Sequence, residues 1–447
     1  MLRTRFWFSF ALLALVVSSG TVMGQFEERT KRREKEEADQ KRPKTYEEKW
    51  TLDPANEDPR WKRANELYRT GHYDETLKLF LSFLAEDPNE VSVVCSMASM
   101  HWDRGEYVLA EKWYDEALKL VPKHVEAKKF KARMFYQMGR WKESEELFKE
   151  LIQVKGLRGD ILGSSRLNLG KIALLRRNFR EASKWFWEAA KSPRKGHRSQ
   201  AEKGRFNVVR FKRTRMWNSM ETAGLKIFFS PRIADAADRS VREAWANDRQ
   251  QALDRILKTL GMSFTQKMPL YVFKDDGDSF EVTNQKLPSW KYSWWIMATG
   301  WKRPPGYDMA LQMVARVRGY RPPSKPMVTG LAAYACGSLG DPHRAARQFL
   351  RQKKLRGFAE VHVSQVYELD EALLYGQSFV AWLIDTYGMD KFLKSFAEYK
   401  LVRLDPRYKS TATGRITWTE LLSEAFRRGI KEDLPTLEKR WKSFLRG

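Results

Sequence analysis

The stretch ASMHWDRGEY, residues 98–107, sets the architecture of the first half of the chain. Its alanine, its glycine and its final aromatic residue recur at the same spacing in ANELYRTGHY, residues 64–73, and in ARMFYQMGRW, residues 132–141. The glycines therefore stand at 71, 105 and 139, a period of 34 residues, with apolar positions at helical spacing on both sides. This pattern predicts pairs of antiparallel helices, which must stack on one another to bury their apolar faces.

Further residues of the frame fall in the second helix of each unit. They are Phe80, Tyr114 and Phe148, with Pro88 and Pro122 closing the first two units. A fourth, looser unit is indicated by Gly170, Phe179, Ala182, Phe186 and Ala189. It is shifted by four residues from the 34-residue period, and the extra residues fall in the stretch 155–163. The frame resembles the tetratricopeptide repeat, and this resemblance implies a concave surface that holds a segment of another protein.

The N-terminus has the pattern of a secretory leader. Arg3 and Arg5 precede an apolar run over residues 7–17, and we expect cleavage after Gly24. If the leader is not cleaved, the same stretch would serve as a membrane anchor, because it approaches the roughly 20 apolar residues of a spanning helix. No other stretch is apolar enough to span a membrane. The sequence thus predicts an exported protein of the periplasm, the cell envelope or the extracellular space.

The chain is strongly basic, with a formal net charge of +26. Residues 27–50 mix both signs and predict a solvated linker. Residues 191–215 carry ten cations against the single acid Glu202. The cations are Lys191, Arg194, Lys195, Arg198, Lys203, Arg205, Arg210, Lys212, Arg213 and Arg215. They indicate either a patch for an anionic partner, such as an acidic protein, an envelope polymer, a lipid head group or a nucleic acid, or a solvated helix and loop between domains. The second interpretation is preferred, because no recognised nucleic-acid module accompanies the charge.

After about residue 217 the pattern predicts an α+β order. Strands are expected over residues 225–229 and 269–273, with a long helix over 234–260 between them. Four acids follow the second strand, namely Asp275, Asp276, Asp278 and Glu281. They lack the regular spacing of a calcium loop, so a turn and a helix cap are expected. Four tryptophans come next, namely Trp290, Trp294, Trp295 and Trp301. They suit a wall of the core, and a hydrophobic face or a ligand platform are the alternatives.

Two motifs in this half resemble the peptidase MA-like domain of the gluzincin zinc metallopeptidases. They are MVTGLAAY, residues 327–334, and YGQSFV, residues 375–380, and the helix over 437–445 resembles the family's closing helix. The similarity spans about residues 222–447. In that family one helix carries HExxH, with two histidine ligands and the general-base glutamate, and a second helix supplies a glutamate as third ligand.

This chain departs from the family at the zinc site. Thr329 stands where the family has its ligand glutamate, and the upstream helix expected over about 307–317 has neither histidine nor glutamate. His343 and His362 lie outside both expected helices. Because a hydrolase of this kind needs a metal with an open position and a base, the sequence predicts no catalytic, metal-binding or cofactor-binding residues and an inactive domain.

A few positions carry residues that other chemistries use. Ser378 lies outside a Gly-x-Ser-x-Gly elbow and suits a packed helix. Cys336 has His343 as its one local base. The acids Glu368, Asp370 and Glu371 suit either an acid/base pair or the charged first turn of a helix. Cys95 and Cys336 are the two cysteines of the chain, and they indicate small buried residues unless the two domains approach closely enough for a bridge.

Together these patterns predict a mostly helical protein in which a repeat solenoid precedes an α+β, gluzincin-like domain. The expected segments are a signal peptide (1–24), a charged linker (25–57), repeats (58–195), a basic connector (196–221) and the peptidase-like domain (222–447). The expected function is an exported scaffold that binds a protein or peptide partner. The alternatives are a metallohydrolase with relocated ligands and a binder of an anionic polymer through the basic connector.

Overall fold

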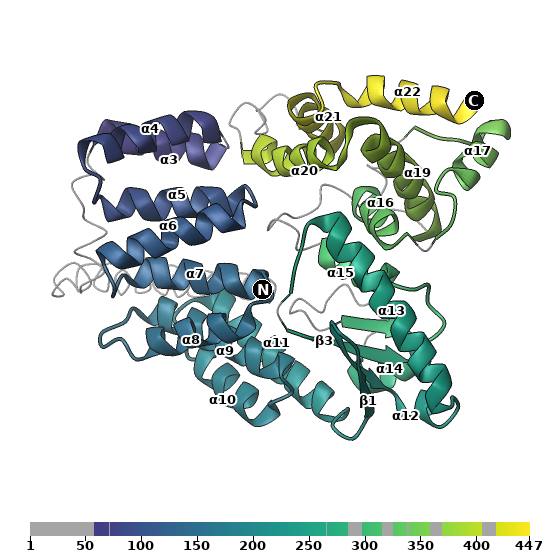
Figure 1. Ribbon diagram of the computed structural model, residues 1–447, viewed down its shortest axis with the longest axis horizontal. Helices are drawn as coiled ribbons and strands as arrows, with labels where there is room; N and C mark the ends of the chain where they lie inside the picture. The colour runs from purple at the N-terminus through teal and green to yellow at the C-terminus, as the bar shows by residue number, and fades with distance from the viewer. Residues whose placement is uncertain are drawn as a thin grey trace, which may run out of the picture. The chain divides into compact units, whose positions relative to one another are not determined.

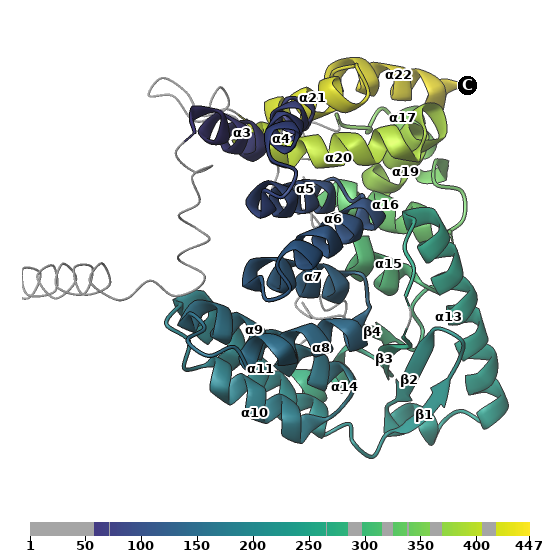
Figure 2. The same cartoon turned by 60° about the vertical axis from the view of Figure 1, so that its left-hand side comes forward.

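The computed structural model describes residues 58–70, 72–264, 266–284, 297–314, 325–337, 339–357, 369–404 and 417–447. Its first part consists of stacked helix pairs (Figures 1 and 2). The pairs are α3 (Pro59–Thr70) with α4 (Tyr73–Glu86), α5 (Val91–Asp103) with α6 (Tyr107–Leu120), α7 (Val125–Gln137) with α8 (Trp141–Ile152), and α9 (Gly159–Leu175) with α10 (Phe179–Ala189). Each helix packs against its pair partner. The helix pairs predicted for the repeats are present, and a helix pair also occupies the looser fourth unit.

The turn inside each unit needs a left-handed backbone. Gly105 and Gly139 both have φ of +76°, a conformation that glycine adopts without steric cost. Gly71 lies outside the described residues. In the fourth unit, the shift of four residues places Arg177 at this position, and its φ is +58°. A non-glycine residue is uncommon there, so Arg177 must be held by other contacts.

The helix α11 (Lys195–Lys212) continues the stack and packs against both α9 and α10. Ala201, Val208 and Phe211 are buried on its packed side. Gly204 lies against Phe186, where an added Cβ would come within 2.5 Å of the ring. The stretch expected to be a basic connector, 196–221, therefore contains a helix packed on the repeats and, at its end, the first strand of the sheet.

The sheet has the order β1-β2-β3-β4. The strands are β1 (Asn218–Glu221), β2 (Leu225–Phe229), β3 (Met268–Phe273) and β4 (Met297–Gly300). β1 is antiparallel to β2, whereas β2, β3 and β4 are parallel, with Ile227 opposite Leu270 and Val272 opposite Thr299. Every residue of β3 is buried. The two predicted strands are confirmed.

The long helix α13 (Arg239–Leu260) connects β2 to β3. It begins later than predicted, because α12 (Pro231–Ala234) ends first and Asp238 stands extended at the N-cap of α13. Beyond the short helix α14 (Asp276–Thr283) and β4, the rest of the described chain is helical. Its elements are α15 (Tyr307–Val314), α16 (Lys325–Cys336), α17 (Arg344–Arg351), α19 (Leu369–Tyr387), α20 (Met389–Leu404), α21 (Trp418–Gly429) and α22 (Leu434–Arg446).

The helices α16 and α19 cross with their backbones in contact. A Cβ added to Gly330 would lie 2.2 Å from the carbonyl oxygen of Gly376, and one added to Gly376 would lie 2.0 Å from the carbonyl oxygen of Pro326. Glycine is required at both positions because the obstructing atoms are backbone, which a side-chain rotation cannot move.

One hydrophobic core runs from the third repeat to the last helix of the chain. It includes Trp141, Phe186, Tyr271, Tyr375 and Trp441, all fully buried. A separate cluster lies in the first units and consists of Trp61, Ala64, Phe80, Phe83, Val93 and Met97. The last repeats and the sheet region thus share one core. Among the described helices none is both long and apolar enough to cross a membrane.

Arg177 contributes to the junction between the repeats and the sheet. Its Nη1 donates to Tyr271 Oη (2.9 Å) and to Thr214 Oγ1 (3.0 Å), and its Nη2 donates to the Thr214 carbonyl (2.7 Å). The guanidinium carbon also stands 3.9 Å from the ring centre of Phe228. The unusual turn residue of the fourth unit is therefore anchored on strands β2 and β3.

Candidate functional site

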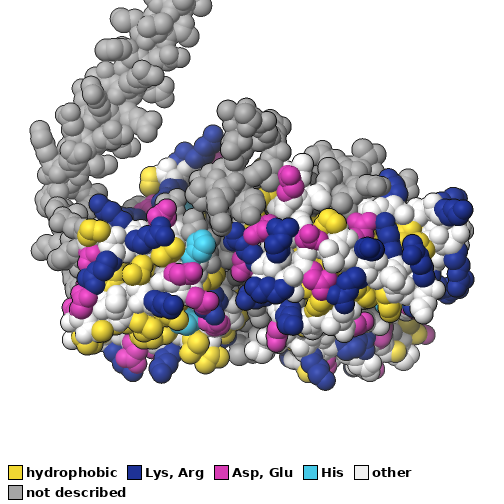
Figure 3. Space-filling view, turned by 90° about the horizontal axis from the view of Figure 1, so that it is seen from above, with side chains coloured by type: hydrophobic (Ala, Val, Ile, Leu, Met, Phe, Trp, Pro, Cys, Tyr) yellow, Lys and Arg dark blue, Asp and Glu magenta, His cyan; other side chains and the backbone are white. Residues whose placement is uncertain are grey.

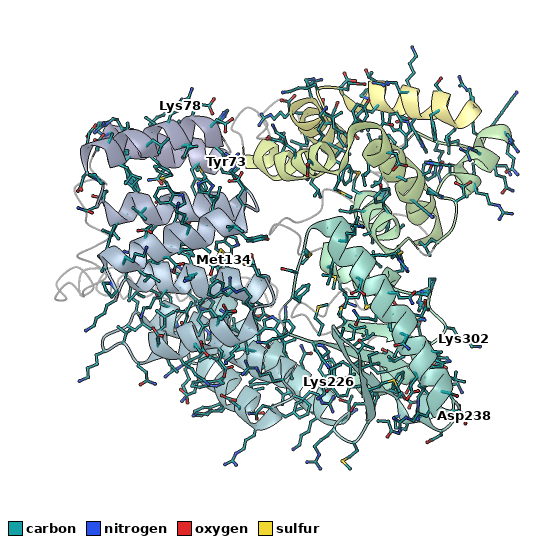
Figure 4. The ribbon with its side chains drawn as sticks, in the orientation of Figure 1. Tyr73, Lys78, Met134, Lys226, Asp238 and Lys302 are labelled. Atoms are coloured by element: carbon teal, nitrogen blue, oxygen red, sulfur yellow. The ribbon has the colours of Figure 1, made fainter. Side chains whose placement is uncertain are left out.

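A polar and aromatic face lies on α3, α5 and α7, the first helices of their units. We call it the repeat face and define it by Tyr68, Trp102, Asp103, Phe130 and Arg133. Trp102 and Asp103 lie in the last turn of α5, and Phe130 and Arg133 lie one helical turn apart on α7. Figure 4 labels Tyr73 in the first unit and Met134 in the third.

Hydrogen bonds between units hold the repeat face in place. Tyr68 Oη donates to Asp103 Oδ2 (2.8 Å), which links α3 to α5. Trp102 Nε1 donates to Gln137 Oε1 (2.9 Å), which links α5 to α7. Burial, together with the nearby Asp103 carboxylate, raises the pKa of Tyr68 far above its ordinary value, so its hydroxyl stays protonated and keeps donating.

Arg133 is the cation of the repeat face. Its guanidinium carbon lies 5.6 Å from the ring centre of Trp102 and 5.8 Å from that of Phe130. Arg133 is exposed, yet desolvation by surrounding protein is the largest influence on its pKa and lowers it.

The charge of Arg133 is not neutralised by an ion pair within the part of the chain that the structure describes. Its neighbour Lys129 differs, because it pairs with Glu126 and stands 4.4 Å from the ring centre of Phe130. A planar guanidinium beside aromatic rings can receive a carboxylate through two parallel hydrogen bonds, while the rings pack against apolar groups of the same ligand. The repeat face thus has the chemistry to bind an acidic peptide segment.

The acids after β3 serve the helix that they precede. Asp275 is the N-cap of α14, and its Oδ1 accepts from the Asp278 amide (2.9 Å). Asp278 Oδ2 accepts from the Lys274 amide (2.8 Å), and Glu281 pairs with Arg232 (2.8 Å). The predicted turn and helix cap are confirmed.

The helices that the peptidase resemblance singles out carry other groups. Thr329 on α16 is fully buried, and its Oγ1 donates to the Pro326 carbonyl (3.1 Å). On α15, Asp308 Oδ2 accepts from Thr299 Oγ1 (2.8 Å), and Gln312 Nε2 donates to the Ala298 carbonyl (3.3 Å). Burial raises the pKa of Asp308. Among the described residues no group of three or more His, Cys, Asp and Glu side chains could hold a metal ion.

In the structure Ser378 lies next to His343, whereas the sequence suggested His343 as a local base for Cys336. Ser378 Oγ lies 3.0 Å from His343 Nδ1 and accepts from Trp441 Nε1 (3.1 Å). All three side chains are buried, and burial lowers the pKa of His343. The prediction that Ser378 is a packed helix residue is confirmed. Its hydrogen bonds tie α19 to α22 and to the N-cap of α17.

The other predicted positions take structural places or lie outside the described residues. Cys336 Sγ donates to the Ala333 carbonyl (3.3 Å), and both cysteines are buried and form no disulfide bridge. Trp301 stacks on Trp245 with ring centres 5.2 Å apart, as expected of a core wall. Asp370 and Glu371 fall in the first turn of α19. His362, Glu368, Trp290, Trp294 and Trp295 lie outside the described residues.

The repeat frame itself did not indicate the repeat face. Its aromatic residues were expected to belong mostly to the core, and Trp102 shares its frame position with Tyr68 and Tyr136. Phe130 and Arg133, in contrast, differ from the residues at the same positions of the other units. A search for large residues that break the frame on the first helix of each unit would have found them.

Comparison with known proteins supports the repeat architecture. Two overlapping stretches, residues 62–125 and 97–161, match the tetratricopeptide repeat family. No curated protein matches the chain. The matched stretches reach from α3 to α8 and include all five residues of the repeat face. Residues 62–161 are therefore tetratricopeptide repeats, an architecture that indicates binding of protein partners.

Proposed function

We propose that the protein is an exported scaffold whose repeat face binds an acidic, extended segment of a partner protein, and that its C-terminal region is a peptidase-like domain without catalytic activity. The observation that carries the binding function is Arg133, an exposed cation beside two neighbouring aromatic rings with no ion-pair partner among the described residues. The fixed hydrogen bonds around it supply a preorganised surface, which lowers the entropy lost on binding. Export rests on the leader pattern of residues 1–24.

Arg133→Glu should weaken recognition of acidic peptides. We expect wild-type protein to retain acidic, aromatic-containing members of an immobilised peptide library over their neutral and basic counterparts. A hydrogen bond to a charged group contributes about 1.5–3 kcal/mol, so the variant should bind the best peptides about tenfold to a hundredfold more weakly in fluorescence anisotropy.

The matched control for Arg133→Glu is Lys78→Glu, which makes the same change of charge at an exposed lysine on α4 (Figure 4). This variant should bind like wild type. Trp102→Ala should weaken binding without a change of charge. Equal affinity of the Arg133 and Lys78 variants for the selected peptides would refute the role of the repeat face.

The proposal of an inactive peptidase-like domain rests on two helices. By the resemblance, zinc ligands would stand on α15 and at position 329. On α15 the chain has Asp308 and Gln312 instead, and at position 329 it has a buried threonine whose hydroxyl is hydrogen-bonded within its own helix. Three nitrogen or carboxylate ligands with one open position are the usual requirement for hydrolytic zinc, and this set does not supply them.

The purified protein should therefore contain no stoichiometric zinc after dialysis against a weak chelator. Elemental mass spectrometry would measure it, with a metallopeptidase that has an intact HExxH helix treated in parallel. The protein should also leave a mixed peptide substrate uncut. Near-stoichiometric zinc together with cleavage would contradict the proposal and favour a metallohydrolase with relocated ligands.

A further inference from the structure

The helix α11 presents an unusual face to solvent. Its packed side is apolar and lies against α9 and α10 (Figure 1). Phe206 and Val209 stand on the opposite side, 66% and 60% exposed, and Met216 just beyond the helix is 83% exposed. Residues 206 and 209 are one helical turn apart, so their side chains are neighbours. An amphipathic helix normally exposes polar residues there, which makes these three side chains informative.

Cations surround the exposed apolar side chains. We define the α11 face by Lys203, Arg205, Phe206, Val209, Arg210 and Met216. At 3.6 residues per turn, Phe206 lies opposite the buried Gly204 and Val208, with Lys203 and Arg210 on one side of it and Arg205 on the other. The first and last turns of α11 add further positive charge through Lys195 and Lys212.

These cations are not balanced within the protein. Lys203, Arg205, Arg210, Lys212 and Arg215 make no ion pair with an acidic side chain in the described part of the chain. The repeats behave differently, since Arg60 pairs with Glu86 and Lys128 with Glu150. On the face in Figure 3, Lys and Arg side chains likewise lie among Asp and Glu side chains. The α11 face therefore carries a local positive potential.

From this combination we infer that the α11 face docks on an anionic lipid bilayer. Anionic head groups attract the cations, and each basic residue near such a surface strengthens binding by about fivefold. The apolar boundary below the head groups receives Phe206, Val209 and Met216, which otherwise remain in water. Duplex nucleic acid would satisfy the cations and leave the apolar side chains exposed. A bilayer satisfies both, and this inference is independent of the repeat face.

Vesicle binding by the full chain tests the inference. The measured quantity is the apparent affinity for phosphatidylcholine vesicles with phosphatidylglycerol, compared with the affinity for vesicles without it. An apolar terminal segment would bind both kinds of vesicle, so only the difference between them reports on the cations. We expect a preference for the anionic vesicles that falls as sodium chloride rises. Arg205→Glu with Arg210→Glu should reduce the preference at least tenfold, since four units of charge change. Phe206→Ser should reduce affinity for anionic vesicles without altering the net charge.

A matched control is Lys78→Glu with Lys302→Glu, which makes the same change of charge at two exposed positions away from α11 (Figure 4). This double variant should keep the preference of wild type for anionic vesicles. All substituted side chains are at least partly exposed, and circular dichroism would show that the variants remain folded.

A label gives a direct readout of depth. Both native cysteines are buried, so a polarity-sensitive dye can be attached selectively at Met216→Cys, with Lys78→Cys as the control position. The first dye should shift to the blue on anionic vesicles and the second should not. The inference would be overturned if the dye at position 216 did not shift, or if Phe206→Ser bound vesicles as tightly as wild type. It would also be overturned if Phe206→Ser weakened binding to duplex DNA as much as it weakened binding to vesicles.

Discussion

Arg177→Ala should lower the free energy of unfolding by about 3 kcal/mol. Hydrogen bonds from a charged donor contribute about 1.5–3 kcal/mol each, and a desolvated cation–π contact contributes about 2 kcal/mol. Part of this loss is offset because water hydrates the groups that the substitution leaves without a partner. The substitution removes the donors to Tyr271 Oη and to the Thr214 carbonyl, and the contact with Phe228. Urea denaturation followed by tryptophan fluorescence would measure the loss.

Two further variants separate the causes. Arg177→Gly removes the same contacts but suits the left-handed backbone, so it should be about 1 kcal/mol more stable than Arg177→Ala. Arg180→Ala changes an exposed arginine in the next helix and should have little effect. Arg177→Ala keeps the backbone strain of wild type, so if it matched wild type the side-chain contacts would contribute nothing and the anchoring role of Arg177 would be wrong.

Gly376→Ala should destabilise the protein by about 3 kcal/mol, at the upper end of the usual cost of overpacking. The added Cβ would lie 2.0 Å from the Pro326 carbonyl oxygen and 2.9 Å from Thr329 Oγ1. Because the nearer atom belongs to the backbone, α16 and α19 must separate to admit the methyl group. The midpoint of thermal unfolding should fall, and circular dichroism would follow it.

The matched control for this prediction is Gly196→Ala. That glycine also lies in a helix, but nothing comes within 4 Å of an added Cβ. Alanine is favoured over glycine in helices by up to about 1 kcal/mol, so this variant should be as stable as wild type or more so. Similar unfolding midpoints for the two variants would show that α16 and α19 are not closely packed at Gly376.

Local patterns predicted the helix pairs and the strands well. The 34-residue frame combines helical periodicity with a turn that needs glycine, and both signals lie within a few residues of each other in the chain. The strands over 225–229 and 269–273 follow from runs of apolar residues with turn signals at both ends. The predicted cap at Asp275 likewise depends on residues within one turn.

Features that depend on distant residues were not predictable in this way. Arg177 occupies a glycine position because residues of β2 and β3 hold it, and no local signal points to them. The contact between Ser378 and His343 arises where α17 packs against α19. The repeat face was missed for another reason. Phe130 and Arg133 stand at positions that vary between the units, and the aromatic position of Tyr68 and Trp102 was expected to belong to the core.

Because the hydrophobic core is divided, the first and third repeats should differ in their stability against local unfolding. The cluster around Trp61, Phe80 and Met97 has few buried side chains, whereas the third unit shares the larger core with the sheet. Stability against local opening follows buried apolar contacts, so amide protons of α3 and α4 should exchange with solvent sooner than those of α7 and α8. The repeat face spans this boundary, with Tyr68 on one side and Arg133 on the other. A bound peptide would therefore slow exchange most in α3, far from its main charged contact.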